Sequence, residues 1–125
     1  MVTIYLKLNP RAFCAIAHGT KKVEIRANKK DKGNKNSLND VKRGNYIIFT
    51  NLSTNEKLTC IIKRITLYKT IKQLLEKEGV KDTLSSTNDI NEGIKSIESI
   101  DNYKNLIKKN GVFAIKIEPI SHLGP

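Results

Sequence analysis

Apolar and polar positions along this chain follow patterns that predict strands and helices in the order β–α–β–β–β–α–α–α–β. Val2, Ile4 and Leu6, for example, alternate with more polar residues, which is the period of a half-buried strand. Strands are predicted over residues 2–7, 21–27, 46–49, 58–67 and 112–118, and helices over residues 10–18, 70–78, 90–97 and 103–110. The polar, glycine-containing residues 28–40 are expected to form a loop.

Short polar motifs mark the predicted helix ends. Asn9 and Pro10 suit the N-cap and the first position of a helix, and Gly19 suits the left-handed residue that ends it. Thr70 and Gln73 form a capping box at the start of the second helix. These motifs place the helix boundaries independently of the apolar pattern.

Strands joined by short hairpins and helices indicate an α+β fold with a small mixed, mainly antiparallel sheet of about five strands. Such a sheet is expected to curl into a barrel with helices at one end, because closure protects its edge strands. The length of 125 residues suits a single domain. We assign this domain to residues 1–118 and expect residues 119–125 to form a flexible C-terminal tail.

Basic residues outnumber acidic residues in this chain. Lysine and arginine total 23 against 12 acidic residues, which gives a formal net charge of +11. More than half of that charge lies between Lys21 and Arg43, where nine basic residues accompany three acidic ones. Clustered positive charge favours a polyanionic partner such as RNA, because neutralising phosphates releases counterions. A codon bias toward lysine and asparagine is the alternative explanation.

The apolar runs are too short to cross a bilayer, and the N-terminus is typical of a strand rather than of a signal peptide. We therefore expect a cytoplasmic protein with no membrane partner. Cys14 and Cys60 lack metal-ligand spacing and are expected to be small buried residues without a disulfide. His18 and His122 have no partner in sequence, and no metal or other cofactor is predicted.

The segment GTKKVEIR, from Gly19 to Arg26, resembles the motif of the ASCH domain family, which is related to the PUA barrel. In that family a helix ends in Gly-x-Lys and the next strand carries Glu-x-Arg. Residues 41–49, 68–78 and 111–117 resemble further family segments in the same order. Where the family usually has aspartate this chain has Asn45, a change that preserves the turn geometry. The resemblance implies a PUA-like barrel, in a small bacterial or phage-type member.

Strand alternation divides this segment between two faces. Val23 and Ile25 are predicted to point inward, and Lys22, Glu24 and Arg26 outward. The resemblance makes the outward face the wall of a ligand-binding groove. Arginine offers a planar fork for a phosphate or a base edge, and glutamate accepts from an exocyclic amine. An ordinary surface ion pair between Glu24 and Arg26 is the alternative.

Further residues are expected to reach the same groove. Lys21 lies at the hinge between helix and strand. Lys29 and Lys30 begin a basic loop that is expected to lie on a phosphate backbone, with a solvated loop as the alternative. Tyr68 is the favoured residue for stacking an unpaired base. The other tyrosines are Tyr5, Tyr46 and Tyr103, and the last two are assigned to core or edge positions.

The resemblance implies two kinds of function. RNA binding through the basic groove is generally proposed for ASCH domains and is the function we expect. The alternative is hydrolysis, because one ASCH branch removes the acetyl group of N4-acetylcytidine with a lysine, a threonine and a glutamate. Lys21 matches that lysine, and Glu78 or Glu76 matches the glutamate. Glu24, however, occupies the threonine position, and a carboxylate does not replace a nucleophilic hydroxyl.

Another amide or phosphoester chemistry stays open, with Glu24 beside Lys21 as a general base, and some ASCH proteins have been proposed as ribonucleases. The candidate catalytic residues are Lys21, Glu24 and Glu78, acting on an N-acylated nucleoside or on RNA. The candidate residues for binding RNA, a nucleotide or a nucleoside are Lys21, Lys22, Glu24, Arg26, Lys29, Lys30 and Tyr68. A monomer is assumed.

Overall fold

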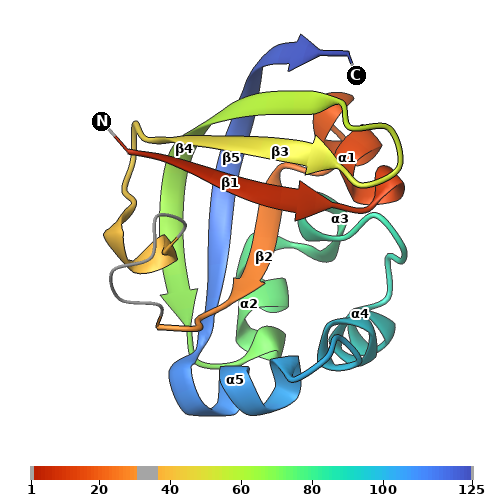
Figure 1. The fold of residues 1–125 in the computed structure, drawn as a ribbon. Coiled ribbons are helices and arrows are strands. Elements are labelled where there is room, and N and C mark those ends of the chain that lie inside the picture. Colours follow the sequence, from red (N-terminus) through yellow and green to blue (C-terminus); the bar gives the residue numbers. More distant parts are fainter. Residues whose placement is uncertain (1, 31–36, 125) are drawn as a thin grey trace.

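The computed structural model describes residues 2–30 and 37–124 of the chain (Figure 1). Its strands are β1 (Thr3–Leu8), β2 (Val23–Ala27), β3 (Tyr46–Asn51), β4 (Lys57–Tyr68) and β5 (Val112–Leu123). Its helices are α1 (Pro10–Ala17), α2 (Ile71–Glu78), α3 (Val80–Thr83), α4 (Ile90–Glu98) and α5 (Tyr103–Asn110), with a 3-10 turn, η1, at Leu38–Asp40. The predicted order of elements is confirmed, and the structure adds η1 and α3.

The strands form one sheet in the order β1-β3-β4-β5-β2. β1 runs parallel to β3, and the other neighbouring pairs are antiparallel. The sheet curls into a half-barrel, with α1 beside the end of β1 and α2 and α5 gathered near the end of β2 (Figure 1). This is the mixed, mainly antiparallel α+β fold that the sequence predicts.

Apolar side chains form two buried clusters that meet at β5. Phe113 and Ile115 belong to the first cluster, which α1 covers, while Val112 belongs to the second, against α2, α4 and α5. Val23 and Ile25 of β2 lie in the second cluster, and both are buried as predicted. β2 is therefore anchored on one face by the helices, and its other face carries the polar side chains of the candidate site.

The predicted C-terminal tail is largely part of the sheet. β5 continues to Leu123, which pairs with the first residue of β4. His122 within this segment makes a 2.8 Å hydrogen bond with Glu56. The boundary expected at residue 118 is therefore too early for the strand. Pairing with the 12-residue β4 extends β5 through residues 119–123, although their own sequence pattern does not predict a strand.

The two cysteines differ in their surroundings. Cys60 is buried in the first cluster as predicted, and burial raises the pKa of its thiol to about 12. Cys14 is exposed, so its prediction as a buried residue is wrong. It lies on the solvent side of α1, whose buried residues are Phe13 and Ile16. Both thiols are free.

Two glycines give a matched test of backbone strain. Gly111 has φ 86° and ψ −175°, and a Cβ there would lie 2.7 Å from the carbonyl oxygen of Tyr68. We expect Gly111→Ala to lower the free energy of unfolding by about 3 kcal/mol, through strain and overpacking together. Gly19 has φ 80° but nothing within 4 Å of a Cβ, so Gly19→Ala should cost only about 1 kcal/mol. Urea unfolding measures both losses, and equal losses would contradict the steric argument.

Candidate functional site

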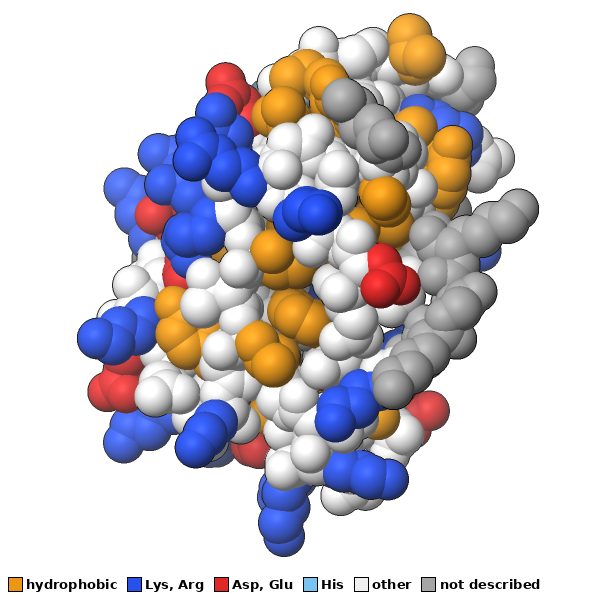
Figure 2. Space-filling model, turned by 90° about the vertical axis from the view of Figure 1, so that its left-hand side faces the viewer, with side chains coloured by type: hydrophobic (Ala, Val, Ile, Leu, Met, Phe, Trp, Pro, Cys, Tyr) orange, Lys and Arg blue, Asp and Glu red, His pale blue; other side chains and the backbone are white. Residues whose placement is uncertain are grey.

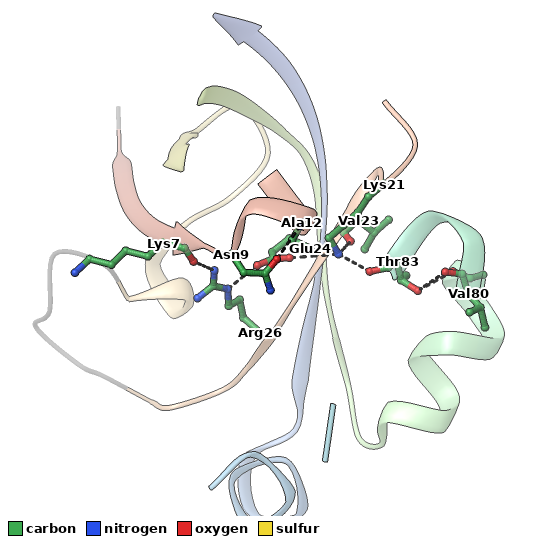
Figure 3. A network of polar contacts seen from close by, with 10 residues as sticks. Lys7, Asn9, Ala12, Lys21, Val23, Glu24, Arg26, Val80 and Thr83 are labelled. Atoms are coloured by element: carbon green, nitrogen blue, oxygen red, sulfur yellow. Dashed lines mark hydrogen bonds and ion pairs between the residues drawn. The ribbon is translucent and has the colours of Figure 1, made fainter. Parts of the chain in front are cut away.

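Lys21, Glu24 and Arg26 form a line of charged contacts along β2 (Figure 3). Glu24 Oε1 lies 3.3 Å from Lys21 Nζ, and Glu24 Oε2 accepts a 2.8 Å hydrogen bond from Arg26 Nε. The side chains of Lys21 and Glu24 are only 6% and 7% exposed, whereas that of Arg26 is 22% exposed. The outward face predicted for this strand is therefore mostly covered, and Arg26 is the member of the line that reaches solvent.

Lys21 is covered by α3, a helix that the sequence pattern does not predict. Its Nζ donates to the carbonyl oxygens of Val23, at 2.8 Å, and of Thr83, the last residue of α3. With Glu24 these are three acceptors, enough for all three hydrogens of an ammonium group. Burial lowers the pKa of Lys21, and the Glu24 carboxylate opposes that shift.

The surroundings of Glu24 favour its ionised form. Burial on its own would raise the pKa of Glu24, but the charges of Arg26 and Lys21 and their hydrogen bonds outweigh burial and hold the pKa below its ordinary value. A carboxylate with a depressed pKa is a weak proton acceptor. The arrangement therefore stabilises a buried anion between two cations more than it prepares a general base.

Arg26 also joins the two edges of the curled sheet. β1 and β2 are the edge strands, and Arg26 Nη2 donates to the backbone carbonyl oxygen of Lys7 in β1 at 2.8 Å (Figure 3). Together with the bond from Nε to Glu24, this contact fixes the plane of the guanidinium group. A partly exposed guanidinium in a fixed plane is suited to an anion or to a base edge.

A pocket of about 340 Å³, the first pocket, opens beside this line of charges. Lys21, Glu24 and Arg26 contribute to its wall, and the exposed side chains of Lys7 and Arg11 also line it. Three serines add hydroxyl groups from the side of α3 and α4, namely Ser85, Ser86 and Ser96. The first pocket therefore combines several cations, one buried carboxylate and a set of neutral hydrogen-bonding groups.

A second pocket, of about 350 Å³, lies next to the first. Lys7, Arg26 and Tyr103 line both pockets, so these residues form the boundary between them. The structure places Lys29 and Lys30 in the wall of the second pocket, where both are exposed. Residues 31–36 of the predicted basic loop lie outside the described residues.

Lys22 lies apart from Glu24 and Arg26. It is exposed and lines a different pocket, of about 290 Å³, together with Lys63 and Lys116. Its backbone N–H donates to the carbonyl oxygen of Asp82, which ties the start of β2 to α3. Lys22 therefore does not share the wall that Glu24 and Arg26 form.

Glu78 and Tyr68 lie together but outside both the first and the second pocket. The Glu78 carboxylate accepts two hydrogen bonds from Arg64, at 2.8 and 2.6 Å, and one from the Tyr68 hydroxyl at 2.5 Å. The hydrogen bonds from Arg64 hold the pKa of Glu78 below its ordinary value. The structure therefore does not bring Glu78 to Lys21, and exposed Glu76 lines neither pocket.

Several lining residues have no motif that points to them. Tyr103 is assigned to a core or edge position by its sequence, and it is 9% exposed, yet it lines both pockets. Lys7 and Arg11 flank the helix start at Asn9 and reach the first pocket because β1 curls toward β2. Their only signal is positive charge next to a strand–helix junction, which alone does not distinguish them from solvated lysines and arginines.

Positive charge also covers surfaces away from the pockets. Figure 2 shows many Lys and Arg side chains on one face, mostly toward its left and lower margins, with apolar side chains between them and fewer acidic ones. Any polyanion would experience this general attraction in addition to specific contacts. Variants that remove charge near a pocket therefore need controls that remove the same charge elsewhere.

The fold and the motif along β2 identify the family. The ASCH domain model matches residues 6–121, and the chain belongs to the ASCH domain family. The predicted family is thus confirmed over nearly the whole chain. ASCH domains are generally associated with RNA. In the part of the chain that the structure describes, no helix has the length and apolar character needed to cross a membrane.

Solved structures of similar fold cover almost the entire chain. The crystal structure of hypothetical protein PH0355 has 31% identity and a TM-score of 0.80, covering 95% of this chain and 100% of its own. Protein PF0455 from Pyrococcus furiosus, solved by NMR, has 27% identity and a TM-score of 0.68, with coverages of 96% and 99%.

A more distant likeness supports the fold alone. A serine-to-alanine variant of ZmASCH from Zymomonas mobilis has 16% identity and a TM-score of 0.57, covering 98% of this chain and 73% of its own. No curated protein matches the sequence. The family and the fold of the chain are therefore established.

Proposed function

We propose that this ASCH domain binds RNA through the basic groove that Arg26 occupies, with one nucleotide in the first pocket. The observation that carries the proposal is that the guanidinium of Arg26 is fixed in place and still partly exposed to solvent. Its guanidinium is held by Glu24 and by the Lys7 carbonyl, it stays partly exposed, and Lys7 and Arg11 stand beside it in the pocket wall. Fixed and clustered cations of this kind suit a phosphate and the edge of a base.

The contacts of the buried charges favour binding over hydrolysis. Lys21 Nζ has three acceptors around it, an arrangement that suits an ammonium group, and an ammonium group has no lone pair with which to attack an acyl carbon. Both oxygens of Glu24 already contact a cation, which makes this carboxylate a poor base. Glu78, the other carboxylate that the family resemblance suggests, lies outside the first pocket. These features support a recognition site that carries out no reaction.

Salt dependence of RNA affinity tests the proposal. We expect the protein to bind a single-stranded RNA of about ten nucleotides with an affinity that falls steeply between about 50 and 200 mM salt. Lys7→Ala combined with Arg11→Ala should weaken binding and reduce the slope of log affinity against log salt by roughly 1 to 2. Fluorescence anisotropy with labelled RNA measures both quantities.

The matched control removes two exposed lysines from α2, which lines neither pocket. Lys72→Ala with Lys77→Ala takes away the same charge and should change the affinity much less. If the wild-type protein shows no salt-dependent binding, or if both double variants weaken it equally, RNA recognition by this groove is wrong. Incubation with N4-acetylcytidine tests the alternative, because Lys21-dependent turnover would favour a hydrolase.

A further inference from the structure

The second pocket differs chemically from the first. Among the described residues that line it are the cations Lys7, Arg26, Lys29 and Lys30, and no carboxylate. The first pocket, by contrast, contains the carboxylate of Glu24, while serine hydroxyls line both pockets. A wall of cations without a counter-anion suits phosphate, whereas a carboxylate suits the exocyclic amine of a base. The two pockets therefore offer complementary surfaces to one nucleic-acid strand.

Hydrogen bonds around Asn28 hold the backbone of Lys30 in the wall of the second pocket. Asn28 is 3% exposed, and its Oδ1 accepts from the backbone N–H of Lys30 at 2.9 Å and from the side chain of Asn39 at 3.2 Å. Its Nδ2 donates to the carbonyl oxygen of Asn110. These bonds accompany a left-handed backbone at Lys30, with φ 52°, a conformation that side chains rarely adopt without support. The start of the basic loop is therefore shaped by the fold.

The boundary between the pockets is also fixed. Arg26 bonds to Glu24, which faces the first pocket, and to the carbonyl of Lys7, which lines both. Tyr103 is the third residue common to the two walls. A strand that passes from one pocket to the other crosses the boundary that Lys7, Arg26 and Tyr103 form. Successive nucleotides are linked by a phosphodiester, and the guanidinium of Arg26 suits that group.

We propose that the second pocket takes the nucleotide next to the one in the first pocket, with the linking phosphodiester on Arg26. This inference rests on the proposed RNA binding and specifies its ligand, which is an RNA strand of at least two nucleotides and not a free nucleoside. The volumes agree, because each pocket lies near the lower end of the roughly 300–1,000 Å³ that small-ligand sites occupy. Each pocket therefore matches a ligand about as large as one nucleotide.

Ligand length and two lysines together test this proposal. We expect the wild-type protein to bind a dinucleotide at least tenfold more tightly than a nucleoside monophosphate, by competition against labelled RNA. Lys29→Ala with Lys30→Ala should weaken the dinucleotide about tenfold and leave the affinity for the monophosphate unchanged. Both lysines are exposed, so an unchanged melting temperature should verify the fold of this variant. Lys72→Ala with Lys77→Ala is the control of equal charge.

Each result bears on the proposal. If the two double variants weaken dinucleotide binding equally, the loss comes only from the change in net charge, and the second pocket is not a binding site. If RNA binds tightly and its affinity does not change when Lys29 and Lys30 are replaced, the second pocket is not a site. Equal affinity for the monophosphate and the dinucleotide would have the same meaning. In both cases RNA binding by the first pocket would stand. Absence of any RNA binding by the wild-type protein would overturn the proposed function and this inference with it.

Discussion

Glu24→Gln is expected to lower the free energy of unfolding by about 3–5 kcal/mol, because it leaves the charges of Lys21 and Arg26 without their buried counter-ion. Glu24 is 7% exposed at its side chain, and it contacts Lys21 Nζ at 3.3 Å and Arg26 Nε at 2.8 Å. Glutamine has nearly the same shape, so the loss reports charge more than packing. Urea unfolding followed by circular dichroism gives the value at neutral pH.

The control for this substitution is an exposed carboxylate on α2. Glu76→Gln removes one negative charge from the surface and should change stability by no more than about 0.5 kcal/mol. Lys21→Met provides a second comparison, because it removes the buried cation and leaves the Glu24–Arg26 pair intact. A loss below about 1 kcal/mol for Glu24→Gln would show that the line of charges does not behave as a buried ion cluster.

The stability lost through Glu24→Gln should depend on pH, and the pKa shift of Glu24 gives the direction of that dependence. The pKa of Glu24 is lower in the folded protein than its ordinary value of about 4.3. Its contribution to stability is therefore fully present above that ordinary value and is lost as the pH falls through the folded value. Glu24→Gln has no such group. The stability difference between the wild-type protein and the variant should narrow below about pH 4, as urea unfolding at several pH values would measure.

Arg26→Lys is expected to weaken RNA binding by about tenfold or more while preserving the net charge. Lysine offers a point charge, and it does not reproduce the fixed planar fork that bonds to Glu24 and to the Lys7 carbonyl at once. Loss of charge-assisted hydrogen bonds worth about 1.5–3 kcal/mol corresponds to a tenfold or larger change in affinity. Anisotropy titrations with the same RNA of about ten nucleotides measure the effect.

The matched control is Arg43→Lys, at an exposed arginine that lines neither pocket. The RNA affinity of this variant should stay within about twofold of that of the wild-type protein, because an exposed side chain contributes only general electrostatic attraction and lysine keeps its charge. If Arg26→Lys binds RNA as tightly as the wild-type protein, the guanidinium of Arg26 is not the contact that we propose. A melting curve of each variant separates loss of affinity from loss of fold.

Local signals account for the parts of the fold that the sequence predicts well. The side chain of Asn9 caps α1 by accepting from the backbone N–H of Ala12, and Thr70 caps α2 in the same way through Gln73. Gly19 has the positive φ expected of a helix stop. Each of these features depends on contacts within a few residues, so their residue types alone indicate them.

The site depends on contacts that no local pattern contains. Lys21 bonds to Thr83 across 62 residues, and Arg26 reaches Lys7 on the opposite edge of the sheet. Glu78 bonds to Arg64 and to the Tyr68 hydroxyl and does not reach Lys21, so the family motif alone does not give its position. The alternation of apolar and polar residues along β2 correctly separates its two faces, but it does not indicate which elements cover each face.

By itself the sequence determined the family, the order of strands and helices, the helix ends and the excess of positive charge. These follow from periodicity, capping chemistry and composition, which are properties of short segments or of the whole chain. Only the tertiary structure decided that Lys21 and Glu24 are buried, that Arg26 joins β1 to β2, and that two pockets share Arg26 as a wall. The reason is physical: burial and ion pairing depend on long-range packing, which the curl of the sheet and the position of α3 create.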